Sequence, residues 1–581
     1  MLPVFYNMPP LFDLASSEGL EIMIKRSLLA TSIAMALVQQ AAATPLLPMD
    51  ARGLAMGSTG VASAKLAHAP QYNPALLSTA NAEDDFAIVL PQIGVVVGDE
   101  EEMIDAFDSI TKDEYEGSNN GDSIIDHFEG ITDRLDKILV SGGGGSVSIE
   151  QQLINFENLI ANVPGNENSD NSTTAADLTA ATTDLNTSAI ALTNETQDLE
   201  DTTFDLTSEL SSISGRAIRG SFGVNGAIAI PSKTFAAAVS VSGAAYFSGR
   251  MFFTDNDKSL FNGYAEGINA YAGETQNYTA ATQQLATAAE NLETCADANP
   301  GNPIACSAEA TAVDLSSTNA ENELANLQSF SYEKDGRTIL STDSTTGDIV
   351  IADDLNSNVQ IVAVGISEVG LTLSREFTIA GENIAIGITP KLQMIKTFNY
   401  VASVDNEEDI KESDVTDTEQ DFSTINLDAG AAYQFGASKQ WQVGVVAKNL
   451  ISKEYEAESN PNETTGETTK TTISLDTQFR GGISHTTDWT VIAIDLDLME
   501  NDPVAFEAAT QYAAIGAELD IFDTIQLRAG YRTNLSVSDS AVASVGLGFS
   551  PFGVHVDIAA MANPSDPKKE AGAALELGFY F

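Results

Sequence analysis

Few side chains have the types and spacing that enzymes use for catalysis or for binding metals. Only four of the 581 residues are histidines, and none stands in the H-E-x-x-H spacing that binds zinc. The chain has no G-x-S-x-G nucleophile turn, and the glycine run 142–145 lacks the lysine of a phosphate-binding loop. His555 and Asp557 could form a catalytic dyad, but we prefer to interpret them as a hydrated polar pair. We therefore expect no catalytic residue, no metal and no cofactor. The histidines are His68, His127, His485 and His555.

A second set of charged side chains alternates with apolar ones in the C-terminal half of the chain. If segments 510–521 and 524–534 pair as a hairpin, Glu518 faces Arg528 across the two strands. If such strands close into a barrel, these charges line its lumen as a polar path or as a docking surface for a plug. The alternative is ordinary ion pairing, since the inner face of a barrel is polar in any case. The lumen-facing candidates are Lys391, Asp428, Asp495, Asp497, Glu518, Arg528 and Arg532.

The N-terminal region has the features of an export signal. A basic stretch begins at Met23, an apolar run follows over 28–38, and small residues end at Ala43. We expect residues 1–43 to comprise a mis-assigned start and a signal peptide, with Met23 as the true start and cleavage after Ala43. The alternative is a membrane anchor, but the apolar run is shorter than the roughly 20 residues that span a bilayer.

The second half of the chain resembles a series of strands. Segments such as 524–533 and 552–561 alternate apolar and polar side chains with a period of two. This alternation is typical of a transmembrane barrel wall and also of a soluble β-sandwich. Export, and strands that continue to the aromatic final residue Phe581, favour an all-β transmembrane barrel in the bacterial outer membrane. We predict about 14 antiparallel strands, near 86–97, 217–230, 234–250, 359–375, 382–399, 421–435, 440–449, 471–484, 488–499, 510–521, 524–534, 540–550, 552–562 and 571–581.

The links between these strands alternate in length. Links such as 231–233 and 436–439 are short, whereas those at 98–215 and 251–358 are very long. Short periplasmic turns and longer extracellular loops are the rule in outer-membrane barrels. We therefore expect residues 86–581 to form the barrel, with 98–215 and 251–358 as extracellular insertions.

The long loops hold most of the charge. The chain has 83 acidic and 27 basic residues, a net charge of −56. Loop 98–215 has 26 acidic and 3 basic residues, and loop 251–358 has 17 and 3. Such a surface excludes binding of nucleic acid by direct charge attraction. It could bind divalent cations or repel anionic partners, and the alternative that we prefer is a solvated surface.

The two long loops also carry helical patterns. Leucines recur every seven residues from Leu178 to Leu206, as they do on one face of a helix. We expect such stripes to pack against each other, with a coiled coil that binds a partner protein as the alternative. Cys295 and Cys306 flank a turn rich in proline and glycine, which predicts a helical hairpin closed by a disulfide. The alternative, a redox pair, would normally use the closer C-x-x-C spacing.

Several short motifs carry a family resemblance. Residues 50–60 (DARGLAMGSTG) and 72–77 (YNPALL) resemble the N-terminal segment of the FadL-like long-chain fatty-acid transporter group. Motifs further along the chain resemble a narrower family of outer-membrane proteins labelled "conjugal transfer protein TraF". They are TPKLQ at 389–393, NLDAG at 426–430, KNL at 448–450, DLDL at 495–498 and QLRAGYR at 526–532.

The resemblance implies a FadL-like, porin-like barrel with an N-terminal plug. Residues 44–85 are rich in small side chains and lack strand alternation, so they could thread closely through a lumen. We expect them to form the plug, and the alternative is a periplasmic tail. The plug residues that we single out are Gly57, Gly60, Asn73 and Pro74.

Two functional hypotheses follow from these patterns. The first is a plugged transporter or channel that admits a small molecule, with a hydrophobic ligand as the form that the resemblance favours. The second is a structural or docking component of an envelope machine such as a conjugative transfer apparatus. An enzyme is disfavoured because no nucleophile and base stand together. The expected partners are outer-membrane lipid, the barrel assembly machinery through the strand ending at Phe581, and a protein bound by the helical loops.

Overall fold

The protein forms two compact units in the computed structural model. One is a β-barrel with the N-terminal segment, and the other is built from the long insertions 105–214 and 253–357. The predicted signal peptide (1–43), the ends of the predicted plug (44–48 and 80–85) and Phe581 lie outside the described residues. The structure describes residues 49–79, 86–118, 121–141, 147–163, 173–342, 349–351, 355–379, 381–403, 412–461, 468–501, 509–522 and 524–580.

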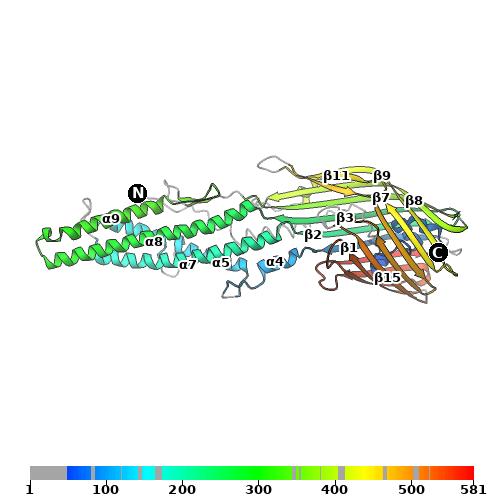
Figure 1. Ribbon diagram of the computed structural model, residues 1–581, viewed down its shortest axis with the longest axis horizontal. Helices are drawn as coiled ribbons and strands as arrows, with labels where there is room; N and C mark the ends of the chain where they lie inside the picture. The colour runs from blue at the N-terminus through cyan, green and yellow to red at the C-terminus, as the bar shows by residue number, and fades with distance from the viewer. Residues whose placement is uncertain are drawn as a thin grey trace. The chain divides into compact units, whose positions relative to one another are not determined.

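Fourteen antiparallel strands of the described chain form a closed barrel, which confirms the predicted fold class (Figure 1). The ring closes because the first strand, β1, pairs with both β2 and β19. In chain order the wall strands are β1 Ala87–Gly98, β2 Ala217–Ile230, β3 Ala236–Phe252, β7 Asn358–Ile379, β8 Glu382–Ser403, β9 Gln420–Phe435, β10 Trp441–Lys448, β13 Gln478–Thr486, β14 Thr490–Asp497, β15 Tyr512–Ile521, β16 Ile525–Asn534, β17 Val542–Phe549, β18 Val554–Ala562 and β19 Ala571–Tyr580. The short helices α10 Glu412–Thr416 and η6 Pro551–Gly553 lie in connections between them.

The wall has an apolar outer face and a polar inner face. On β16, Leu527 and Tyr531 are 44% and 45% exposed, whereas Arg528 is 4% exposed. The same alternation holds on β15, where Ile515 faces outward and Glu518 faces the lumen. Closing the ring pairs the edge strands with each other, and the outward apolar rows suit the hydrocarbon core of a bilayer. The protein is therefore a β-barrel of the bacterial outer membrane.

One predicted strand is wrong in its bounds. The segment predicted at 471–484 is divided, and only β13 belongs to the wall. Its first part, β12 Lys470–Leu475, pairs instead with β11 Lys453–Glu458 in a separate hairpin. The hairpin side chains Tyr455 and Ile473 pack on the inward-facing Val364 and Ile395, so burial of apolar surface decides this pairing.

The unit built from the insertions is largely helical. Its helices α7 and α8 lie side by side, and α9 packs on α8 (Figure 1). Leu178 and Leu185 of α7 form one apolar cluster with Tyr278 and Leu285 of α8 and Val313 of α9, so the heptad stripes pack against one another. None of the helices in the described ranges is long and apolar enough to cross a bilayer. The helices are α4 Met103–Thr111, α5 Ile124–Asp136, η4 Lys137–Ser141, α6 Ile149–Ala161, α7 Ala175–Ile213, α8 Asp255–Ala298, η5 Pro303–Cys306 and α9 Ser307–Gln328.

The end of the second insertion is a small sheet, so the expectation of a helical loop is wrong for this part. Its strands are β4 Ser331–Lys334, β5 Arg337–Thr342 and β6 Ile349–Ile351. Asp335 and Gly336 join β4 to β5 with φ angles of +54° and +79°. An Asp-Gly pair with positive φ at both residues is the turn that a two-residue hairpin prefers. This dipeptide is the sequence signal that indicates the hairpin.

A disulfide bond joins Cys295 and Cys306 at the turn between α8 and α9. We expect the variant C295S/C306S to lower the unfolding free energy of the helical unit by about 3 kcal/mol, because the bond restricts the unfolded chain. Thermal unfolding followed by helical circular dichroism measures this change, and wild-type protein with a reductant should match the variant. An unchanged helical transition in both samples would contradict the prediction.

Candidate functional site

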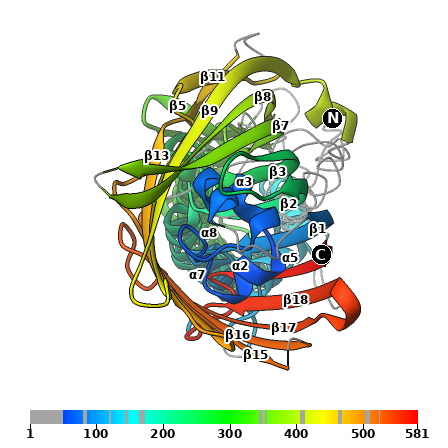
Figure 2. The same cartoon turned by 90° about the vertical axis from the view of Figure 1, so that its right-hand side faces the viewer.

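Residues 49–79 lie inside the barrel as a chain of short helices, and we call this segment the plug (Figure 2). Every residue of α2, α3 and η3 is buried. The helix α2 packs against β16–β19, while η3 packs against β7–β9, so the plug contacts widely separated parts of the wall. The plug helices are α2 Ala51–Ala55, η2 Leu66–His68, α3 Ala69–Tyr72 and η3 Pro74–Ser78.

Glycines on the inner face of the wall make room for the plug backbone. A Cβ atom at Gly530 would lie 2.1 Å from the Gly57 nitrogen, and one at Gly516 would lie 2.3 Å from the Met56 carbonyl oxygen. No side chain fits at such distances, so glycine is required where the two backbones approach. A Cβ at two more wall glycines would meet plug backbone atoms at 2.4 Å: Gly387 (Pro74) and Gly444 (Val61). At three others it would meet plug side-chain atoms at 2.0–2.4 Å: Gly223 (Met49), Gly430 (Asn73) and Gly546 (Ala55).

The two predicted plug glycines bind wall side chains through their backbone. Gly57 has a φ of +67° and donates its N–H to the Ser544 hydroxyl at 3.1 Å. Gly60 donates its N–H to Asp495 Oδ2 at 2.7 Å, and Val61 donates to the same oxygen at 2.9 Å. Asp495, a predicted lumen residue, therefore holds the plug rather than another charged side chain of the wall.

The predicted Asn73 and Pro74 also contact the wall. The Asn73 amide donates to the carbonyl oxygens of Val61 and Ala431, at 3.0 and 3.2 Å. Its side-chain oxygen accepts from the Ala75 N–H at 3.1 Å and so caps η3. Pro74 begins η3 beside Gly387. This Asn-Pro pair thus turns the plug chain and joins it to β9.

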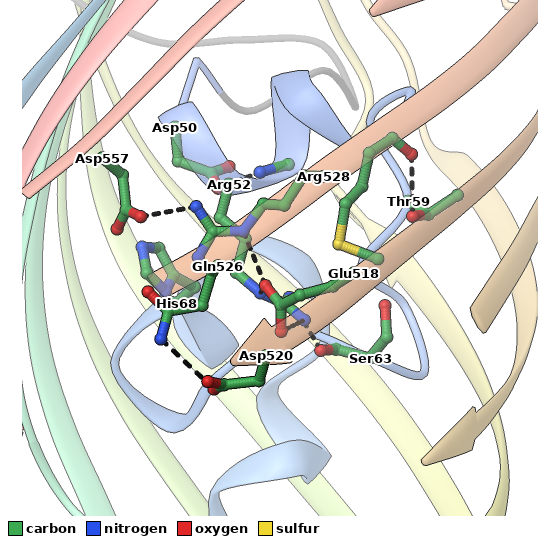
Figure 3. Close-up of polar contacts among 12 residues, drawn as sticks. Asp50, Arg52, Thr59, Ser63, His68, Glu518, Asp520, Gln526, Arg528 and Asp557 are labelled. Carbon is green, nitrogen blue, oxygen red and sulfur yellow. Dashed lines mark hydrogen bonds and ion pairs between the residues drawn. The ribbon is translucent and has the colours of Figure 1, made fainter. Parts of the chain in front are cut away.

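A buried ionic network connects α2 to the wall (Figure 3). Glu518 accepts from Arg52 Nε at 2.9 Å and from Arg528 Nε at 2.6 Å. Arg528 also donates through Nη1 to Asp557 at 2.5 Å. Glu518 stands opposite Arg528 in the β15–β16 register, as the parity of the two segments requires. Because all four groups are buried, each charge depends on its partners for compensation.

A second ion pair joins η2 of the plug to β19 of the wall. His68 Nε2 lies 2.9 Å from Glu576 Oε1 on β19, and Tyr72 donates its hydroxyl to Asp50 Oδ1 at 2.5 Å. Ligand atoms of Asp50, His68 and Glu576 all lie within 4.8 Å of one another, so these three residues could hold a metal ion. In the structure the ion pair and the hydrogen bond engage these same groups.

Sequence reasoning interpreted Asp557 only as a polar pair with His555, and it did not select the following members of these networks as site residues: Asp50, Arg52, His68, Tyr72 and Glu576. One signal was available, because Arg52, Lys65 and His68 are the only basic side chains among residues 49–79. A positive charge inside a lumen requires a carboxylate or water nearby. The identity of that carboxylate depends on which strand lies next to the plug, and the sequence does not contain this information directly.

Two further predicted lumen residues pair in different ways. Asp497 binds Arg480 Nε at 2.5 Å across β13 and β14, so this pair lies wholly within the wall. Arg532 pairs with Glu570 and also donates to the Ser58 hydroxyl of the plug at 3.0 Å. The predicted set therefore divides between residues that stabilise the wall and residues that hold the plug.

Lys391 and Asp428 form a third group on neighbouring strands. The Lys391 ammonium lies 3.0 Å from Asp428 Oδ1 and 3.0 Å from Glu368 Oε1. Asp428 also accepts the Asn449 N–H at 2.9 Å. All three side chains line one cavity of the lumen.

A partly open cavity lies between the plug and the wall strands β2, β3, β7–β10 and β13. The plug contributes Met49, Pro70 and Gln71, so part of the cavity surface would leave with the plug. Most of the remaining lining is polar or charged. The wall residues are Gly223, Asn225, Ser240, Ser242, Gly243, Ala244, Tyr246, Glu368, Gly370, Thr389, Lys391, Asp428, Lys448, Asn449 and Gln478.

Comparison with protein families gives one match. Residues 70–497 match the model of a family described as "F plasmid transfer operon, TraF, protein". The matched range includes the end of the plug, both insertions and the wall from β1 to β14. No curated protein matches the chain.

Comparison with solved structures gives several barrels at low sequence identity. The toluene transporter TbuX of Ralstonia pickettii has 9% identity and a TM-score of 0.40, with 92% of this chain and 99% of that chain covered. A FadL homologue of Pseudomonas aeruginosa has 9% identity, a TM-score of 0.38 and coverages of 93% and 99%. The toluene transporter TodX of P. putida has 9% identity, a TM-score of 0.36 and coverages of 92% and 99%.

Proposed function

The chain belongs to the family of F plasmid transfer operon TraF proteins, and from this premise we propose that it is a plugged transporter or channel for a small molecule. The observation that carries the proposal is the partly open cavity, which plug and wall residues line together. A molecule bound there would lie against Gln71 of the plug. Displacement of the plug would then open a path through the lumen, along which the bound molecule could leave the cavity.

Apart from its chain connection to β1, the plug is held to the wall by polar contacts and by apolar packing of side chains such as Leu54 and Leu76. The plug groups that donate hydrogen bonds to the wall include the N–H groups of Gly57 and Gly60, the Asn73 amide and the Arg52 guanidinium. Each hydrogen bond contributes roughly 0.5–1.5 kcal/mol net, or about 1.5–3 kcal/mol where one group is charged. Contacts of this size can be exchanged for water one at a time, which supports a plug that moves.

A reversible cross-link tests whether transport requires the plug to move. The hydroxyl oxygens of Ser78 in η3 and Ser374 in β7 lie 2.7 Å apart, so the variant S78C/S374C should form a disulfide that locks the plug. With galacturonate, galactose and toluene as probes, we expect oxidised S78C/S374C in liposomes to lose uptake of each probe that the wild type transports, and a reductant to restore it. Deletion of residues 44–80 should leave uptake that the reductant does not change.

The single variants S78C and S374C are matched controls, and both should keep wild-type uptake in either redox condition. Wild-type protein with reductant controls for the loss of the Cys295–Cys306 disulfide. Uptake by the oxidised double variant equal to that of the wild type would exclude a moving plug. No uptake by the wild type or by the deletion variant, with both folded, would overturn the transport proposal.

The second candidate function is a structural or docking component of an envelope machine, such as a conjugative transfer apparatus. The ionic network favours it, because Arg52, Glu518 and Arg528 are buried and paired with one another, as expected of a plug that stays in place. This function predicts no uptake in any variant. It also predicts that the full chain binds a partner protein through its helical unit, which a pull-down with a variant lacking residues 105–214 would measure.

A further inference from the structure

We infer that the lumen cavity binds a small hydroxylated carboxylate, with the ammonium of Lys448 as the group that holds the carboxylate. This inference rests on the proposed function and names the substrate class for the same cavity. Its basis is a set of three polar side chains that line the cavity and have bonding capacity left over: Gln71, Lys448 and Gln478.

Lys448 differs from the other lysine of the cavity. Lys391 lies 3.0 Å from each of two carboxylates, Glu368 and Asp428. Lys448 is partly buried on the inner face of β10, and no hydrogen bond or ion pair joins it to any described residue. Asp428 attracts Lys448, but Asp428 is already held by Lys391 and by the Asn449 N–H. A charge inside a membrane protein without a close partner indicates a functional site.

The two glutamines add one acceptor and one donor. Gln478 is 9% exposed, and its Oε1 has no hydrogen-bond partner among the described residues. Gln71 of the plug is 7% exposed, and its Nε2 likewise has no partner within the described part of the chain. Lys448 stands opposite Gln478 in the β10–β13 register, so the ammonium and one amide are neighbours. Buried groups of this kind are normally satisfied by water or by a ligand.

These groups specify the chemistry of the ligand. The Lys448 ammonium and the Gln71 amide both donate hydrogen bonds, so they require an acceptor, and a carboxylate provides one with the opposite charge. The Gln478 oxygen requires a donor, which a hydroxyl group provides. The nearby Ser240, Ser242 and Asn225 can bind further hydroxyl groups. A hydrocarbon offers neither kind of group and would leave all of these atoms unsatisfied.

The test measures binding to the purified full-length protein in detergent by titration calorimetry, with galacturonate, galactose and toluene as probes. We expect galacturonate to bind the wild type more tightly than galactose, with no detectable toluene binding. K448M should weaken galacturonate binding by roughly tenfold or more, as expected for loss of a charge-assisted bond, and should leave galactose unchanged. K448R should retain most of the galacturonate affinity. Q478L should weaken both sugars severalfold, because the hydroxyl partner is lost.

K233M is the matched control, because Lys233 is an exposed lysine in the short link between β2 and β3. It should bind all probes like the wild type. Equal galacturonate affinity in wild type and K448M would overturn the inference, as would tighter binding of toluene. Binding of none of the probes would also overturn it and would assign only water to the cavity.

Two results together separate this inference from the proposed function. Toluene uptake that the S78C/S374C lock abolishes, without galacturonate binding, would keep the transporter and reject the carboxylate. Galacturonate binding that depends on Lys448, without any uptake, would keep the binding site and reject transport.

Discussion

The variant G516A/G530A should displace the plug and open the barrel to ions and small solutes. Each new Cβ atom would lie less than 2.4 Å from backbone atoms of Met56 or Gly57. Backbone atoms cannot rotate out of the way as a flexible side chain can, and Gly57 already holds a positive φ of +67°. Overpacking at one site typically lowers the folding stability by about 1–3 kcal/mol. Here the two new Cβ atoms would both clash with the same turn of the plug, at Met56 and Gly57.

Two measurements report the displacement of the plug. Conductance across planar bilayers should rise severalfold over the wild type, and a protease should cleave within residues 49–79 of the variant only. G481A is the matched control, since a Cβ at this wall glycine of β13 would meet its nearest atom at an ordinary 3.5 Å. A closed pore with a protected plug in G516A/G530A would show that the wall glycines are not needed to seat the plug.

The variant R528M should destabilise the folded barrel by about 3–5 kcal/mol, the cost of breaking a buried ion pair by removing one partner. Arg528 is 4% exposed and binds both Glu518 and Asp557. After its removal Glu518 keeps Arg52, but Asp557 becomes a buried carboxylate without its cation. The change in stability should appear as a lower denaturant midpoint, followed by the heat-dependent mobility of the folded barrel on gels.

A second substitution distinguishes lost charge compensation from lost packing. R528M/D557N should recover part of the loss, because the uncompensated Asp557 charge is gone. R375M is the matched control, since Arg375 lies exposed near the end of β7 and its removal should change stability little. A midpoint for R528M equal to that of R375M would show that the network does not stabilise the barrel.

The sequence alone determined the architecture of the wall. Alternation with period two is a local property, because successive side chains of any strand point to opposite faces. A wall with lipid on one side and a polar lumen on the other must therefore show this alternation in its sequence. The same parity predicts that Glu518 lies opposite Arg528, and the register of β15 and β16 pairs these two residues.

Local sequence patterns predicted strand pairing less well where tertiary contacts favour a different partner strand. Residues 470–475 have strand character, so the sequence predicts that they continue into the following wall strand. They pair with β11 instead, because Tyr455 and Ile473 bury their side chains against Val364 and Ile395 of the inner wall. No periodicity in the sequence indicates which of two possible strand partners buries more apolar surface.

Only the tertiary structure decided how the plug meets the wall. Arg52 and Glu518 are 466 residues apart in the chain, and their contact exists only once the barrel has closed around the plug. The close approach of the plug backbone to Gly530 and the cavity lined by Lys448 likewise exist only in the closed barrel. A residue type and its spacing determine which face of a strand a side chain occupies. Its partners across a lumen depend on ring closure and plug position, which are long-range properties that local sequence patterns do not specify.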